Sequence, residues 1–250
     1  MDHTPSSALR ISPMIAGLVE TWHDGPDTPP LVACAPLGYV YTERSRPRPG
    51  DKVDTIATNR GVCLIYRLYS RLVNTAQYQT FEHIAVFLHG SGLKSLFVVI
   101  YRPGSAAAPS SFFDEFADLL DHVTSYSSVV IMGDVNLHLE SPTDAGAVRF
   151  LSLLAMNNLV QVVQSPTHTA GHLLDVVVVV VRSDTMVTSV NVPSPVLSDH
   201  SMNNVALGLR CCNLELFTRV ARGGRLATMT LSAIFSNRTS YAVRRMMSLN

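Results

Sequence analysis

The sequence has no net charge, few cysteines and no long apolar run, and each of these absences excludes a class of protein. Lys and Arg total 19, as do Asp and Glu, so bulk charge gives no sign of a polyanionic partner. The four cysteines form no C-x-x-C pair, which argues against a zinc site and against a secreted disulfide framework. The longest apolar run, residues 173–181, is too short to cross a bilayer and contains Asp175. No charged-then-apolar leader opens the chain, so we expect a soluble, intracellular protein with reduced thiols and no membrane partner.

The sequence contains enough apolar material for a folded core. Apolar residues make up 47% of the chain and charged residues 15%, which argues against a disordered protein. The charge is unevenly distributed, because residues 211–250 contain six arginines and a single acid, Glu215. We interpret this basic tail as a solvated or disordered extension, with the binding of a polyanion as the alternative.

Short runs rich in Val, Ile, Phe and Tyr predict strands, and two helical patterns lie between them. Residues 111–123 predict a helix that begins with a capping box from Ser111 to Asp114, and residues 147–156 predict a second helix. Residues 23–60 show no sustained periodicity and predict irregular connections. The pattern favours an α/β (α+β) fold in which helices cover sheets. The predicted strands are residues 61–66, 81–88, 96–101, 129–132, 159–163, 173–181, 186–192 and 205–209.

The clearest chemical signal is the segment V-V-I-M-G-D-V-N at residues 129–136. A buried-type strand runs directly into Gly, Asp134 and, two residues later, Asn136. If the chain stays extended, period-2 geometry places both side chains on one side. A carboxylate and an amide at a strand end can hold a hard cation or a water molecule and orient a phosphate oxygen. The alternative is an ordinary turn, because Gly, Asp and Asn all favour turns.

Four further segments place chemically useful side chains at or beside predicted strands. Asp175 lies inside the most apolar strand, where a buried carboxylate needs a partner, and a histidine ring is the obvious one; the alternative is a strand-edge residue facing water. Ser198-Asp199-His200 offers an acid beside an imidazole, although such surface loops are commonplace. Glu20 follows the apolar stretch 14–19 as a possible Mg²⁺ ligand, and Tyr101 ends another strand with a phenol that can bind a phosphate.

Together these segments resemble a known family in their order and wording. The order is E-T-W, Y-R-P, G-D-V-N, L-D and S-D-H, which resembles the endonuclease/exonuclease/phosphatase superfamily. The phrases P-T-H at 166–168 and G-H-L-L-D at 171–175 narrow the resemblance to the apurinic-type endonuclease domain of LINE-like non-LTR retrotransposons. The resemblance implies a two-sheet β-sandwich flanked by helices, and a DNA endonuclease (with RNA as an alternative substrate) that would work in the nucleus.

The resemblance also implies roles for the residues of these segments. Glu20 and Asp199 would hold or surround Mg²⁺, with Mn²⁺ as an alternative ion. Tyr101 and Asn136 would hold the scissile phosphate.

The remaining three residues would handle protons. Asp134 would orient or deprotonate the attacking water. His200 would bind the phosphate or act as general acid or base, and Asp175 would steer its ring. These implied roles agree with the chemistry of the residues themselves. A hard cation stabilises the charge that develops on the phosphate, and an acid prepares the nucleophile.

The chain also departs from the family pattern. Family members open with a strand that bears a site Asn, whereas the first Asn here is Asn59. We therefore expect a non-matching segment at 1–13, a domain at 14–209 that lacks its first strand and so exposes a sheet edge, and a tail at 211–250. This departure favours a rival hypothesis, an inactive retroelement remnant that at most binds nucleic acid. A second rival is a superfamily phosphatase that acts on a small molecule or a lipid headgroup.

Overall fold

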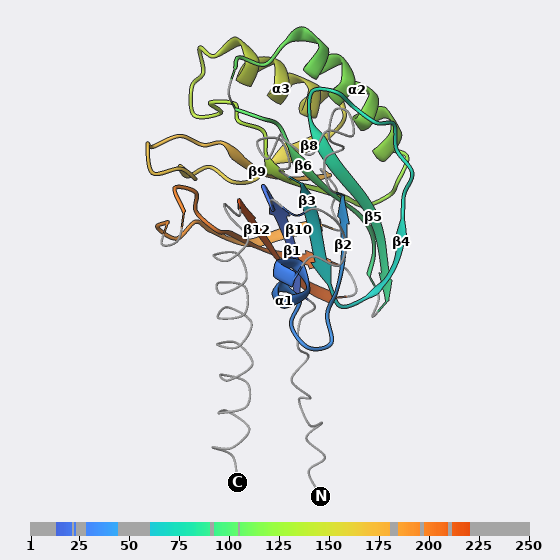
Figure 1. The fold of residues 1–250 in the computed structure, drawn as a ribbon. Coiled ribbons are helices and arrows are strands. Elements are labelled where there is room, and N and C mark those ends of the chain that lie inside the picture. Colours follow the sequence, from blue (N-terminus) through green and yellow to red (C-terminus); the bar gives the residue numbers. More distant parts are fainter. Residues whose placement is uncertain are drawn as a thin grey trace, which may run out of the picture.

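Two six-stranded β-sheets pack face to face, and helices lie on their outer surfaces (Figure 1). The structure is a computed structural model that describes residues 14–21, 23, 29–44, 61–90, 93–104, 106–180, 185–195, 198–209 and 212–220. The expected class, an α/β two-sheet sandwich flanked by helices, is confirmed.

The first sheet has the strand order β10-β11-β12-β1-β3-β2. The short helix α1 (Pro29–Cys34) covers its outer face, where Leu31 and Cys34 pack on Leu18 and Ile65. The strands are β1 (Met14–Val19), β2 (Val40–Arg44), β3 (Val62–Tyr66), β10 (Thr185–Asn191), β11 (Asn203–Leu209) and β12 (Cys212–Val220).

The second sheet has the strand order β4-β5-β6-β7-β9-β8. Its outer face is covered by α2 (Ser110–Val123) and α3 (Ala145–Met156), which lie side by side above the sheet in Figure 1. The strands are β4 (Tyr69–Leu72), β5 (Glu82–Gly90), β6 (Leu93–Tyr101), β7 (Val129–Asp134), β8 (Leu159–Gln161) and β9 (Asp175–Val180).

The central strands β6, β7 and β9 of the second sheet are buried on both faces, which explains their continuous apolar sequences. In β9, Val177 and Val179 point into the core between the sheets, whereas Val176 and Val178 point toward α2 and α3. The same alternation along β6 and β7 builds two cores on either side of one sheet. Because each face is covered, this sheet provides a rigid base for any side chain at its ends.

Strand β12 differs from the expectation that the domain ends at Leu209. It pairs antiparallel with β11, from Asn203↔Thr218 to Leu209↔Cys212, and parallel with β1, from Met14↔Glu215 to Val19↔Val220. Among the described residues, β1 therefore has a neighbour on each side, β12 and β3, and the expected exposed edge beside it is wrong. The expected segments 1–13 and 221–250 lie outside the described residues.

The starts of the helices differ from the expected ones. The N-cap of α2 is Pro109, which makes no side-chain cap, so the expected capping box is wrong. Asp114 instead pairs with Arg149 of α3 at 3.1 Å. Helix α3 begins at Ala145, because the Asp144 side chain accepts a hydrogen bond from Ala147 N at 2.7 Å and caps it.

The stretch expected to be irregular, residues 23–60, contains α1 and β2, and residues 24–28 and 45–60 of it lie outside the described residues. Within the described residues, no helix is both long and apolar enough to cross a membrane.

Candidate active site

Three candidate residues lie in a row across the second sheet at the end of its central strands. Tyr101 ends β6, Asp134 ends β7 and Asp175 begins β9. The strand pairing places Tyr101 opposite Asp134, and Asp134 opposite Asp175. Directly opposed residues project to the same face of a sheet, so the register alone brings a phenol and two carboxylates together. Both carboxylates are buried, with exposed fractions of 1% and 0%.

Asp134 and Asn136 meet through a turn and not through an extended strand, which corrects the geometry expected from the sequence. Asn136 has a left-handed backbone with φ of 48°. This turn lets Asn136 N donate to Asp134 Oδ1 at 2.8 Å, and Asn136 Nδ2 donate to Asp134 Oδ2 at 2.9 Å. Left-handed backbone at a non-glycine residue is costly and is concentrated at functional sites.

A buried arginine, which sequence reasoning did not single out, holds this turn. Arg102 donates from Nε to Val135 O at 2.6 Å and from its terminal nitrogens to Asn136 O and Ala106 O. In return, Arg102 O accepts a hydrogen bond from Asn136 Nδ2 at 2.7 Å. In the sequence, Arg102 belongs to the Y-R-P segment, in which only Tyr101 is predicted to have a role.

Asp175 has the histidine partner expected for a buried carboxylate. His200 Nδ1 lies 2.9 Å from Asp175 Oδ2, and both side chains are almost fully buried. The backbone of β9 is fixed here by Thr167, whose Oγ1 accepts hydrogen bonds from Leu174 N at 3.0 Å and Asp175 N at 3.1 Å. Asp175 Oδ1 is buried and has no hydrogen-bond partner among the described residues.

The electrostatics of this group are dominated by burial and by crowded carboxylates. Burial, reinforced by the charges of Asp175 and Glu20, raises the pKa of Asp134 well above its ordinary value of 3.8, although His200 and the amide of Asn136 oppose this. Burial lowers the pKa of His200, but the hydrogen bond and charge of Asp175 outweigh it, so that the pKa lies above 6.5. Negative charge on Asp134 is therefore unfavourable in this site, and a bound cation would stabilise its ionised form.

Glu20 reaches the same site from the first sheet. It follows β1 directly, has a left-handed φ of 54° and is 7% exposed. Tyr101 Oη donates to Glu20 Oε1 at 2.5 Å, so the phenol expected to bind a phosphate also contacts this carboxylate.

Asp199 lies beside a histidine that sequence reasoning quoted but gave no role. His168 Nε2 lies 3.4 Å from Asp199 Oδ2, and the rings of His168 and His200 meet edge-on with centroids 4.8 Å apart. The two loops are joined by an isolated bridge between His168 and His200. The P-T-H phrase and the S-D-H phrase are thus one structural unit.

The donor set fits a divalent cation. Among the described residues, two groups of possible ligands converge here, Asp134 with Asp175 and His200, and His168 with Asp199 and His200. Neither of these groups of described residues includes Glu20. The unpartnered Oδ1 of Asp175 and the crowded carboxylates provide hard oxygen donors, which Mg²⁺ and Ca²⁺ prefer.

Comparison with known proteins agrees with this architecture. Residues 95–203 match the model of a family described as endonuclease-reverse transcriptase. The chain is similar to the structure of the human Nocturnin catalytic domain with bound sulfate anion, with a TM-score of 0.52 and 21% identity over 82% of this chain and 81% of that one. It is also similar to the endonuclease domain of TRAS1, a telomere-specific non-LTR retrotransposon, with a TM-score of 0.56 and 12% identity over 80% of this chain and 98% of that one. No curated protein matches the sequence.

These findings confirm the family resemblance drawn from the sequence. The protein has the endonuclease/exonuclease/phosphatase fold, and residues 95–203 carry the family match. Members of this superfamily generally use divalent metals. The fold and the match at residues 95–203 support nuclease- or phosphodiesterase-type hydrolysis in general.

Proposed function

We propose that this protein is a Mg²⁺-dependent endonuclease that hydrolyses phosphodiester bonds of DNA. The observation that carries the proposal is a network of buried contacts at the ends of the paired strands β7 and β9. In this network Asp134 contacts Asn136, and Asp175 contacts His200. Burying carboxylates is costly even when they are hydrogen-bonded, and acids with perturbed pKa values beside an imidazole are typical of sites that move protons.

Glu20 is the proposed first ligand of the metal ion, and Asp199, which lies beside His168, is the proposed second acid near it. The contact from Tyr101 fixes the orientation of the Glu20 carboxylate. A bound Mg²⁺ would supply charge stabilisation for the phosphate as negative charge develops on it.

Asp134 is proposed to accept a proton from the attacking water. Its raised pKa makes the carboxylate a stronger base than an exposed aspartate. Both of its oxygens accept a hydrogen bond from Asn136, which fixes the carboxylate plane. The second lone pair on each oxygen remains available for water.

His200 is proposed to donate a hydrogen bond to a phosphate oxygen or a proton to the leaving group. Its Nδ1 is directed to Asp175, so the tautomer is fixed and Nε2 is the nitrogen left for substrate. The raised pKa keeps the ring cationic at a higher pH than that of a free histidine, which suits a proton donor.

The first test compares substrates. Purified protein is incubated with supercoiled plasmid DNA and, separately, with inositol phosphates, each with Mg²⁺ or EDTA. We expect DNA nicking in the presence of Mg²⁺ and not in EDTA. We expect no phosphate release from inositol phosphates. Release from inositol phosphates without DNA nicking would instead identify a phosphatase.

An inactive remnant is distinguished by a matched variant. Asp134→Asn keeps the shape of the side chain and removes its charge, and it is assayed beside the wild-type protein after both are shown to melt cooperatively. Nicking that is equal in the two preparations would assign the activity to a contaminant and would leave the chain a folded remnant.

A further inference from the structure

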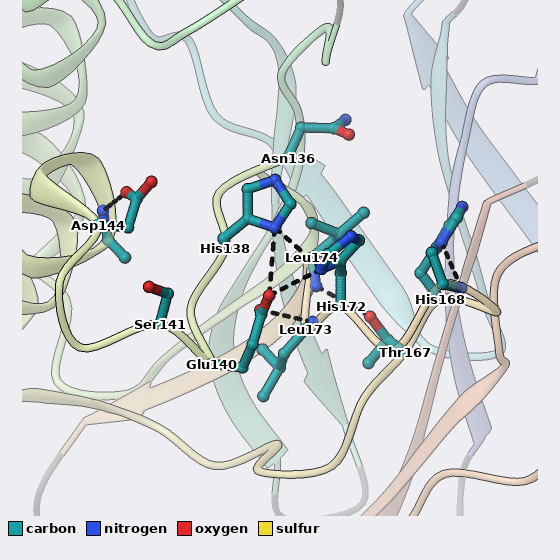
Figure 2. Close-up of polar contacts among 12 residues, drawn as sticks. Asn136, His138, Glu140, Ser141, Asp144, Thr167, His168, His172, Leu173 and Leu174 are labelled. Atoms are coloured by element: carbon teal, nitrogen blue, oxygen red, sulfur yellow. Dashed lines mark hydrogen bonds and ion pairs between the residues drawn. The ribbon is translucent and has the colours of Figure 1, made fainter.

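A third group of possible metal ligands among the described residues lies just outside the buried site. His138 and Glu140 belong to the loop between β7 and α3, and His172 belongs to the loop that leads into β9. Figure 2 shows the three side chains converging from these two loops. All three are partly open to solvent, with side-chain exposures of 47%, 32% and 40%.

The donor atoms face one another closely. His172 Nδ1 lies 2.8 Å from Glu140 Oε1, His138 Nδ1 lies 3.2 Å from the same oxygen, and the two Nδ1 atoms are 3.1 Å apart. The rings meet edge-on, with centroids 4.2 Å apart.

Protons alone satisfy this triangle poorly. If both rings carry a proton on Nδ1, each can donate to Glu140 Oε1, but the two N–H groups of His138 and His172 then face each other. If one ring lacks that proton, its lone pair faces the carboxylate oxygen. A single cation would accept lone pairs from all three donors, which is the arrangement that these distances favour.

The loops hold the donors in place without an ion. Leu173 N donates to Glu140 Oε2 at 2.9 Å, which turns the other carboxylate oxygen toward both rings. Leu139 N donates to Leu173 O at 3.2 Å and so ties the two loops together. Partial burial works against the charge of Glu140, but the hydrogen bonds from Leu173 N and from its own backbone, with those from both histidines, lower its pKa to about 2. The carboxylate is therefore ionised at neutral pH.

We infer that His138, Glu140 and His172 form a binding site for a transition-metal ion of the Zn²⁺ type at the rim of the candidate active site. Two imidazoles and one carboxylate suit Zn²⁺, Co²⁺ or Ni²⁺ better than Mg²⁺, which prefers oxygen ligands. Tetrahedral zinc with bonds of about 2.1 Å separates its ligands by roughly 3.4 Å, so each donor here needs to move by only a few tenths of an ångström.

The site would clamp the two loops together. Asn136 lies two residues before His138, and Asp175 lies three residues after His172. The ion would thus restrain both segments that lead to the buried network. The open sides of the site leave the remaining coordination positions to water.

The test measures binding of Zn²⁺ to the full chain by calorimetry in millimolar Mg²⁺, which competes for the oxygen-rich active site. Binding is measured in the Asp134→Asn background, so the result does not depend on whether the protein is a nuclease. We expect one tight Zn²⁺ equivalent, and a rise in the melting temperature when it binds.

Variants assign the ion to its ligands. His172→Ala and Glu140→Gln should each weaken Zn²⁺ binding by more than about 100-fold, because even outer-shell partners of metal sites are worth 10–100-fold. Glu140→Gln keeps an oxygen for Leu173 N and guards against a simple loss of folding. His122→Ala, an exposed histidine on α2, should bind Zn²⁺ like the parent. Zn²⁺ affinity that is unchanged in both ligand variants, or no binding by the parent, would overturn the inference.

Discussion

Replacement of Gly133 by alanine adds a single methyl group but should cause a large loss of stability. It lies in β7 directly before Asp134 and has φ of +141°, a conformation that side chains rarely adopt. A Cβ at this position would lie 1.9 Å from the carbonyl oxygen of Ile100, its partner in β6. Real Cβ atoms essentially never approach within 3.0 Å.

The cost of Gly133→Ala follows from this geometry. Strands β6 and β7 would have to separate by about 1 Å, which takes ordinary N–H···O bonds beyond bonding range. Strained backbone costs about 1–3 kcal/mol and each lost hydrogen bond about 1 kcal/mol, so we expect a loss of about 4 kcal/mol or more. For a chain of this size that corresponds to a fall in melting temperature of roughly 8–16 °C.

Gly171→Ala is the matched control. Gly171 also has a left-handed φ, of +85°, but nothing lies within 4 Å of the position of its missing Cβ. Only the backbone preference is lost, at about 1–2 kcal/mol, and the melting temperature should fall by a few degrees. Thermal melts followed by circular dichroism measure both. Equal melting temperatures for the two variants would refute the close approach of β6 and β7 at Gly133.

Three further predictions concern the site and its support. Asp175→Asn should lower nicking by about 100-fold or more and move the alkaline limb of the pH–rate profile to lower pH, because Asp175 holds the pKa of His200 up. Gly104→Ala should lower nicking, because its Cβ would lie 2.3 Å from Asn136 Oδ1 and displace the side chain that donates to Asp134 and Arg102. Burial, with a contribution from a nearby arginine, lowers the pKa of His83 from 6.5 to about 4, so the unfolded chain binds a proton more readily. Stability should therefore fall by about 3 kcal/mol between pH 6.5 and pH 4, and His83→Gln should remove most of that slope in urea melts.

Each of these has a clear contrary result. If the alkaline limb of the pH–rate profile is unshifted in Asp175→Asn, that limb does not report the titration of His200. A Gly104→Ala protein with wild-type activity would show that the Asn136 amide is not needed where the structure places it. A His83→Gln protein with the same pH dependence of stability as the wild-type protein would assign that dependence to other groups.

The second sheet could be predicted from the sequence because its signals are local. Strands such as β6, β7 and β9 are continuous apolar runs, and the valines of β9 are buried on both faces as expected. Helix α2 shows its apolar stripe directly in the sequence, as Phe112, Phe116 and Leu120.

Strand β12 could not be predicted as readily, although its pattern was present. Residues 212–220 alternate Leu214 and Leu216 with Asn213 and Glu215, which is a period-2 pattern. The six arginines of residues 211–250 favour a solvated extension instead. What the pattern could not supply is the parallel pairing with β1, which joins opposite ends of the described chain.

The candidate site was predictable in its members and less so in its geometry. Asp175 and His200 were expected to meet, because a buried carboxylate needs a partner, and they do. The turn at Asn136 and the arginine that braces it depend on three-dimensional contacts that no short motif encodes. In the sequence, His168 is only the last residue of the P-T-H motif. Its position beside His200 depends on the contact between two loops that are distant in the sequence.

The most direct test of the account is nicking of supercoiled plasmid by the wild-type protein, Asp134→Asn, His200→Ala and the control His122→Ala, each with Mg²⁺ and with EDTA. We predict open-circle product only with Mg²⁺, at equal rates for the wild-type protein and His122→Ala. The two site variants should be slower by about 100-fold or more. Folded wild-type protein that nicks no faster than Asp134→Asn and His200→Ala would contradict the proposal that this buried network hydrolyses phosphodiester bonds.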